Sequence, residues 1–222
     1  MRAATTANAH CVFDMRACYR GPAHRPVTLD HPPQAERLKA GAGGGLTTAI
    51  NYALYQVGWL ACVFGATWSH PWAGVAIGGL TLTTHLMLAE DRGAELRLAC
   101  LLGVVGACVE GVQMAAGTLS FSPGGLTSWL PPVWIILLWM QFAGTLRFSL
   151  RWLTFQPRLA ILFGATGGPL VYVAVSRLGV VRIQSPQWQS LLVLSALWAV
   201  AMWVATWLAR DPGSVNPGRY RI

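Results

Sequence analysis

The sequence predicts an all-α integral membrane protein, a bundle of six transmembrane helices with both termini in the cytoplasm. The first observation is the composition: 54% of the residues are hydrophobic and only 11% are charged, whereas soluble domains average about 25% charged residues. The second is that the charges lie between nearly uncharged segments of about 20 residues, the length of a bilayer-spanning helix. The third is that Lys and Arg gather in alternate loops, as the positive-inside rule describes.

Six apolar segments follow one another along the chain. Each is expected to be a helix, because inside a bilayer the backbone polar groups must satisfy one another. Pro71, Pro132 and Pro157 lie where segments begin, and there the missing N–H group of proline costs no helical hydrogen bond. The predicted spans are 46–68, 71–89, 95–116, 132–152, 158–178 and 188–208.

The rest of the chain forms two tails around a transmembrane domain of residues 46–210. Residues 1–45 are rich in Arg and Pro, end in "GAGGG" and contain no apolar run. They are expected to form a basic, disordered cytoplasmic tail rather than a signal peptide. Met15 is a second candidate start, which leaves open that part of this stretch is not native. Residues 211–222 are expected to form a short cytoplasmic tail.

The distribution of basic residues predicts the orientation. With the N-terminus in the cytoplasm, 14 of the 16 Lys and Arg residues fall on the cytoplasmic side and only Arg177 and Arg182 fall outside. This asymmetry accounts for the net charge of +8, so no nucleic-acid partner is expected. The expected partners are the lipid bilayer and its anionic headgroups, with a homo-oligomer or a membrane partner as a further expectation.

Glu110 lies within the third span and has no charged residue within ten positions on either side. On a helix with 100° per residue it shares a face with Gly103 and Ala107, whereas branched aliphatic residues occupy the opposite face. Small residues allow helices to approach closely, so Glu110 is expected to face protein rather than lipid. The expected hydrogen-bond partners of Glu110 are Gln113, Gln141, Trp59 and Tyr172.

The polar residues of the spans lie at different depths. With a rise of 1.5 Å per residue, Glu110 lies roughly 7 Å outside the midplane, and His85, Asn51 and Arg147 lie roughly 8 Å inside it. A direct pair between His85 and Glu110 is therefore not expected, and Arg147 is expected to extend to the inner headgroups. Ionisable groups within membranes often mark ion or proton paths, and the candidate substrate or proton path consists of Glu110, Gln113, Gln141, His85, Asn51 and Tyr172.

The stretch "GATGGP" at 164–169 lies near the centre of the fifth span. Its glycines and proline predict a helix break at Gly167, Gly168 and Pro169, a feature of many transporter binding sites. The alternative is a kinked, tightly packed helix. No Lys, Ser or Thr follows in the pattern of a phosphate-binding loop.

The sequence predicts no metal site, cofactor or catalytic residue. The spacing of His10, Cys11, Cys18 and His24 in the tail matches no compact metal-binding motif. The spans contain no paired carboxylates and no cluster of His residues. An enzyme is therefore the less favoured class.

Three segments together resemble a functionally uncharacterised family of small bacterial inner-membrane proteins. They are "NYALYQVGWLACVFGA" (51–66), "PPVWIILLWMQFAGTLRFSLRWL" (131–153) and "GATGGPLVYVAVSRLG" (164–179), and the resemblance covers about residues 51–210. It implies a compact multi-span fold and a location in the bacterial inner membrane, and it implies no reaction.

Three classes of function remain open at this point. Glu110 and the predicted helix break favour a small transporter or permease with Glu110 as a polar or proton-exchanging site. The small-residue faces fit a non-catalytic accessory or assembly subunit of a membrane complex equally well. An intramembrane enzyme acting on a lipid is less favoured, because no pair of catalytic groups lies at one depth.

Overall fold

The protein is described here by a computed structural model covering residues 34–122, 130–210 and 220–221. Seven helices and two short strands make up this part of the chain. In order they are α1 (Gln34–Thr67), α2 (Pro71–Leu88), α3 (Arg92–Ala115), β1 (Leu119–Phe121), α4 (Val133–Arg147), α5 (Arg151–Thr154), α6 (Pro157–Ser176), β2 (Val181–Ile183) and α7 (Gln187–Ala209).

The prediction of an all-α membrane protein is confirmed at this level. Four helical segments are long and apolar enough to cross a membrane: Gly44–Thr67, Arg92–Ala115, Pro157–Ser176 and Gln187–Ala209. The α4 helix is apolar but shorter, and α2 has 18 residues. The crossing of the membrane by all six long helices, and the location of both termini, stay predictions.

Two predicted boundaries differ from the structure. The first helix begins at Gln34 rather than at 46, so the end of the predicted basic tail is helical, while residues 1–33 lie outside the described part. The fourth segment ends as α4 at Arg147, and the short α5 follows in place of a continuous helix to 152. The carbonyl of Thr145 accepts hydrogen bonds from the N–H groups of Phe148 and Leu150, which turns the chain out of the helix.

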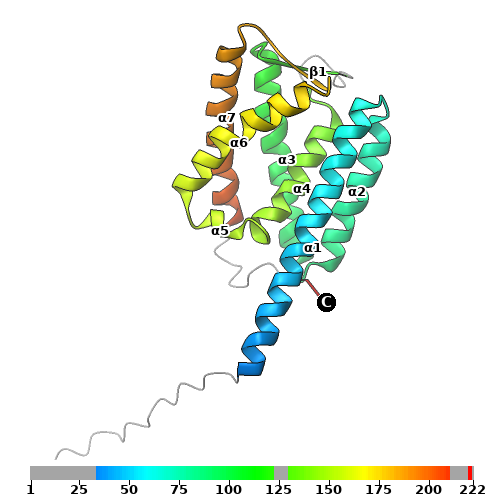
Figure 1. The fold of residues 1–222 in the computed structure, drawn as a ribbon, viewed down its shortest axis with the longest axis vertical. Helices are drawn as coiled ribbons and strands as arrows, with labels where there is room; N and C mark the ends of the chain where they lie inside the picture. The colour runs from blue at the N-terminus through cyan, green and yellow to red at the C-terminus, as the bar shows by residue number, and fades with distance from the viewer. Residues whose placement is uncertain (1–33, 123–129, 211–219, 222) are drawn as a thin grey trace, which may run out of the picture.

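The six long helices alternate in direction, with α1 beside α2 on one side, α6 and α7 on the other, and α3 and α4 between them (Figure 1). Strands β1 and β2 pair antiparallel, with Ser120 opposite Arg182. We call the end with these strands the β end. We call the opposite end, with the α2–α3 turn, α5, Arg210 and residues 220–221, the basic end.

Local sequence explains where the helices begin and how closely they pack. The carboxylate of Asp91 accepts a hydrogen bond from the N–H of Ala94 at 2.9 Å and so caps α3. Gly74 of α2 lies so near α1 that an added Cβ would stand 2.6 Å from the carbonyl oxygen of Ala61. Close packing of this kind is typical of membrane helices.

The outward faces of the helices are apolar. On α3, Val104 is 63% exposed while Glu110 is 0% exposed. Leu80, Leu162, Leu170 and Val200 are likewise more than half exposed on other helices. Polar residues inside and apolar residues outside suit a hydrocarbon environment, as the two faces of the third span predict.

Candidate functional site

Glu110 is completely buried and is held by three hydrogen-bond donors from three helices. The hydroxyl of Tyr172 on α6 donates to Oε1 at 2.5 Å, and the indole N–H of Trp139 on α4 donates to the same oxygen at 3.2 Å. Nε2 of Gln113, one turn along α3, donates to Oε2 at 3.3 Å. We call these four residues the Glu110 centre. Among the described residues no Lys, Arg or His lies within ion-pair distance of Glu110.

The amide of Gln113 gives this centre two ways to bond the carboxyl group. Its Oε1 is buried and has no hydrogen-bond partner. Because an amide carries both donors and an acceptor, a rotation of this side chain would present Oε1 to a protonated Glu110. The centre can therefore accommodate Glu110 with or without a proton.

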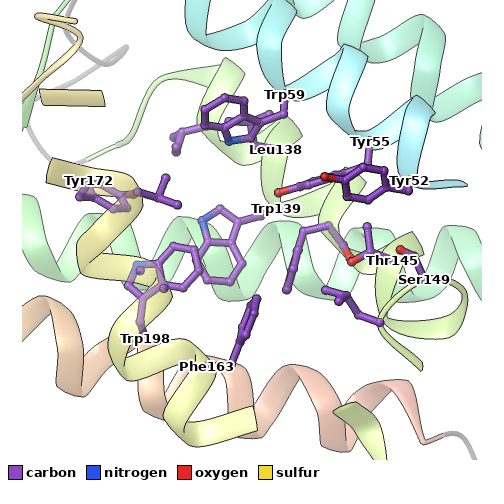
Figure 2. Close-up of a pocket in the computed structure, with 16 residues that line it drawn as sticks. Tyr52, Tyr55, Trp59, Leu138, Trp139, Thr145, Ser149, Phe163, Tyr172 and Trp198 are labelled. Atoms are coloured by element: carbon purple, nitrogen blue, oxygen red, sulfur yellow. The ribbon is translucent and has the colours of Figure 1, made fainter. Parts of the chain in front are cut away.

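A cavity of about 260 Å³ lies beside the Glu110 centre. Aromatic side chains from α1, α4, α6 and α7 form most of its wall: Tyr52, Tyr55, Trp59, Trp139, Phe142, Phe163, Tyr172 and Trp198. Figure 2 shows the side chains of α1 and those of α6 and α7 approaching the cavity from opposite sides, with Trp139 between them. We call it the aromatic cavity; two residues of the Glu110 centre, Trp139 and Tyr172, belong to its wall.

A second polar cluster lies at the basic end of the bundle. Glu95 on α3 is 3% exposed and accepts from Nε of Arg147 at 3.1 Å, and its other oxygen lies 3.3 Å from Nε2 of His85. Nδ1 of His85 lies 2.8 Å from the hydroxyl of Tyr220, which also accepts from Nδ2 of Asn51 at 3.3 Å. We call these five residues the Glu95 centre.

The Glu95 centre corrects the prediction for Arg147. Its guanidinium group is buried against Glu95 and does not extend to the headgroups. Burying two charges is costly unless they pair with good geometry, and here the α3 carboxylate supplies that pairing. Sequence reasoning missed Glu95 because it lies at the edge of an apolar segment, where a charge normally faces headgroups.

Tyr220 was also missed, because it lies in the predicted C-terminal tail. The N–H of Arg221 donates to the carbonyl of Leu88 at 2.8 Å, and this bond docks the chain on the end of α2. Burial raises the pKa of Tyr220 to about 12, against the lowering effect of the hydrogen bond from Asn51. Its hydroxyl therefore stays neutral at physiological pH. No signal in the sequence marks this contact.

The predicted partners of Glu110 are confirmed for Gln113 and Tyr172 and wrong for Gln141 and Trp59. Oε1 of Gln141 accepts from Thr81 at 3.2 Å instead. Trp59 lies in the wall of the aromatic cavity. His85 and Asn51 belong to the Glu95 centre, away from Glu110 as expected. The candidate path residues are therefore divided between the two centres, except Gln141, which belongs to neither.

Of the two alternatives for residues 164–169, the structure has the tightly packed helix and not the break at Gly167, Gly168 and Pro169: α6 runs without interruption from Pro157 to Ser176 with Pro169 inside it. Proline leaves the carbonyl four residues earlier without its helical donor. That carbonyl belongs to Ala165, and the hydroxyl of Ser195 on α7 donates to it at 2.7 Å. Gly168 allows this approach, since an added Cβ would overlap Trp198.

The residues His10, Cys11, Cys18 and His24, considered above for a metal site, lie outside the described part of the chain.

Comparison with known proteins yields a family and no activity. No curated protein and no solved structure matches the chain significantly. One family model, described as "Protein of unknown function (DUF2878)", matches residues 48–204, which include both polar centres except Tyr220. The chain therefore belongs to the DUF2878 family of proteins of unknown function.

Proposed function

We propose that this protein is a small membrane transporter that binds a compact, largely apolar molecule in the aromatic cavity and exchanges protons at Glu110. The observation that carries the proposal is that two residues belong both to the wall of the aromatic cavity and to the Glu110 centre. Tyr172 and Trp139 line the cavity and also donate the hydrogen bonds to Glu110. A molecule in the cavity would contact the groups that hold the carboxyl, so its binding would be coupled to the hydrogen bonding of Glu110.

The packing of the helices supports a moving part. The α6 helix packs mainly on α7 among the long helices, and it reaches α1, α3 and α4 chiefly through the side chains around the cavity. The bond from Tyr172 to Glu110 ties α6 to α3 across this region. Loss of that bond would release α6 from α3, while α7 stays packed on α3 and α4, so α6 is the proposed moving part.

A route for protons toward the basic end is also part of the proposal. A small cavity of about 10 Å³ is lined by Asn51, Tyr55, Thr81, His85 and Gln141 among others. This is roughly the volume that one water molecule needs. Tyr55 also lines the aromatic cavity, so a single water would connect the wall of that cavity with His85 of the Glu95 centre.

The orientation completes the proposal: all six long helices cross the bacterial inner membrane, with the basic end in the cytoplasm. Among the described residues, Arg92, Arg97, Arg151, Arg158 and Arg210 lie toward the basic end, and Arg177 and Arg182 toward the β end. The positive-inside rule favours this placement. A reporter enzyme inserted after Gly179 is expected to be active only outside the cytoplasm, and activity inside would reverse the topology.

The transport proposal is tested in liposomes that contain the purified protein and a pH-sensitive dye. A panel of small aromatic and aliphatic amphiphiles is added, and proton movement is followed for the wild type, Glu110→Gln and Glu90→Gln. Glu90 is an exposed carboxylate at the basic end, so its variant is the matched control. At least one compound is expected to drive proton movement in the wild type and the control but not in Glu110→Gln.

Two outcomes would contradict the proposal. Equal transport of that compound by Glu110→Gln would remove Glu110 from the mechanism. No transport of any compound, together with identical small-molecule contents of a deletion strain and its parent, would remove transport itself. Purification in a stable complex with a second membrane protein would then favour the accessory subunit.

A further inference from the structure

A second hollow lies at the basic end, on the side where α3, α4 and α7 meet. Its volume is about 350 Å³. Its lining combines three arginines with apolar side chains: Ala94, Arg97, Leu98, Leu101, Arg147, Trp207, Leu208 and Arg210. We call it the basic groove; it shares only Arg147 with the polar centres, and it shares no residue with the aromatic cavity.

The groove carries an excess of positive charge. Among the described residues, the only ion pair of its three guanidinium groups is that of Arg147 with the carboxylate of Glu95. Arg97 is exposed and forms no ion pair with a described residue. Arg210 donates from Nε to the carbonyl of Thr154, which fixes its position, and its terminal amino groups bond no other described residue. No carboxylate of a described residue lines the groove, so this lining suits a group with one or two negative charges.

The remainder of the groove is apolar and opens on the outward face of the bundle. Trp207 is 63% exposed and Leu101 is 38% exposed. Continuing along α3, Val104 is 63% exposed. Arg97 and Arg210 at the end of the bundle, followed by an apolar strip along the helices, match the shape of a lipid with a charged headgroup and an acyl chain.

We propose that the basic groove binds the phosphate of an anionic glycerophospholipid. Arg97 and Arg210 hold the phosphate oxygens, because guanidinium groups recognise phosphate with two parallel hydrogen bonds. One acyl chain lies along Leu101 and Trp207. A free phosphate ion would leave the apolar part of the groove without a partner, so the lipid is the better match.

The site is tested by native mass spectrometry of the purified protein, titrated with phosphatidylglycerol or with phosphatidylcholine carrying the same acyl chains. The wild type is expected to retain the anionic lipid and to bind the neutral one weakly. Each charge near an anionic lipid changes affinity about fivefold, so Arg97→Gln is expected to weaken binding roughly fivefold and the double variant with Arg210→Gln about thirtyfold.

Matched controls separate this site from general charge attraction. The pair Arg177→Gln and Arg182→Gln removes the same charge at the β end and is expected to leave the affinity unchanged. Arg97→Lys retains the charge but not the paired hydrogen bonds, and is expected to fall between wild type and Arg97→Gln. Millimolar inorganic phosphate is expected to leave the lipid bound.

Four results would overturn the assignment. They are equal retention of the neutral lipid, unchanged affinity in the exposed variant Arg97→Gln, equal loss in the β-end control, and displacement of the lipid by inorganic phosphate. The last would identify a site for a soluble anion. None of these results depends on transport, so the lipid site and the proposed function can fail separately.

Discussion

The hydrogen bond from Tyr172 to Glu110 is the most direct place to perturb the structure. Tyr172→Phe removes one hydroxyl and keeps the aromatic ring in the cavity wall. The bond is 2.5 Å long and both residues are at most 2% exposed. Hydrogen bonds to charged groups contribute about 1.5–3 kcal/mol, and a neutral acceptor about 1 kcal/mol.

We therefore expect Tyr172→Phe to lower stability by about 1–3 kcal/mol. For a chain of this length about 1 kcal/mol corresponds to roughly 2–4 °C in Tm, so the melting temperature in detergent should fall by at least about 2 °C. Tyr52→Phe is the matched control, because Tyr52 is 56% exposed and forms no hydrogen bond within the described chain. Its Tm is expected to stay within about 1 °C of wild type.

A double-mutant cycle identifies Glu110 as the partner. In a Glu110→Gln background the same Tyr172→Phe change should cost less, because the acceptor is no longer a carboxyl group. Equal costs in the two backgrounds, or a Tm of Tyr172→Phe that matches the Tyr52→Phe control, would refute the reasoning about this contact.

Three further substitutions test other parts of the bundle, each followed by thermal unfolding in detergent. Arg147→Gln leaves the buried carboxylate of Glu95 without its arginine partner, so we expect a loss of about 3–5 kcal/mol. The exposed Arg151→Gln should cost less than about 0.5 kcal/mol, and equal effects would show that the buried ion pair is absent. Ser195→Ala leaves a carbonyl of α6 without a donor and should cost about 1–3 kcal/mol, whereas an unchanged Tm would mean that another group satisfies it. Gly106→Ala forces a methyl group against the indole of Trp139 on α4 and should cost about 1–3 kcal/mol. Its control, Gly79→Ala, has open space around it and should be neutral or stabilising. A larger loss of stability for Gly79→Ala than for Gly106→Ala would contradict the packing.

The sequence was sufficient to predict where the six long helices lie, apart from the start of α1 and the end of α4, and which side of α3 is buried. Both properties depend on local patterns, namely the length of apolar runs and the spacing of small residues. Glu110 could be placed inside the protein for this reason, and its bond to Gln113 connects residues one turn apart on the same helix.

Contacts between helices were harder to predict, because they depend on how each helix is rotated. Trp139 and Gln141 are two positions apart on α4 and so point about 200° apart. Only one of them can face α3, and the structure turns Trp139 toward Glu110 and Gln141 toward Thr81. Nothing in the sequence of α4 decides between these rotations.

Charges at the ends of helices were misread for a different reason. Arg147 lies in the last turn of α4 and Glu95 in the first turn of α3, and each alone fits a side chain that reaches toward the headgroups. Their pairing depends on the depth at which α4 ends relative to the start of α3, and that depth is set by tertiary packing. Tyr220 belongs to the same group of contacts, because its docking on α2 involves residues far apart in the chain.

The placement of two buried carboxyl groups on one helix has an electrical consequence. Glu95 and Glu110 are about fifteen residues apart on α3, so they lie about 22 Å apart along its axis. This is roughly three quarters of the thickness of a hydrocarbon core of about 30 Å. A proton that travelled between the two groups would cross about three quarters of the membrane voltage. Its free energy would therefore change by about 1.7 kcal/mol for each 100 mV across the membrane. The current through such a protein would therefore respond to voltage even if every step of the movement took place inside the bundle.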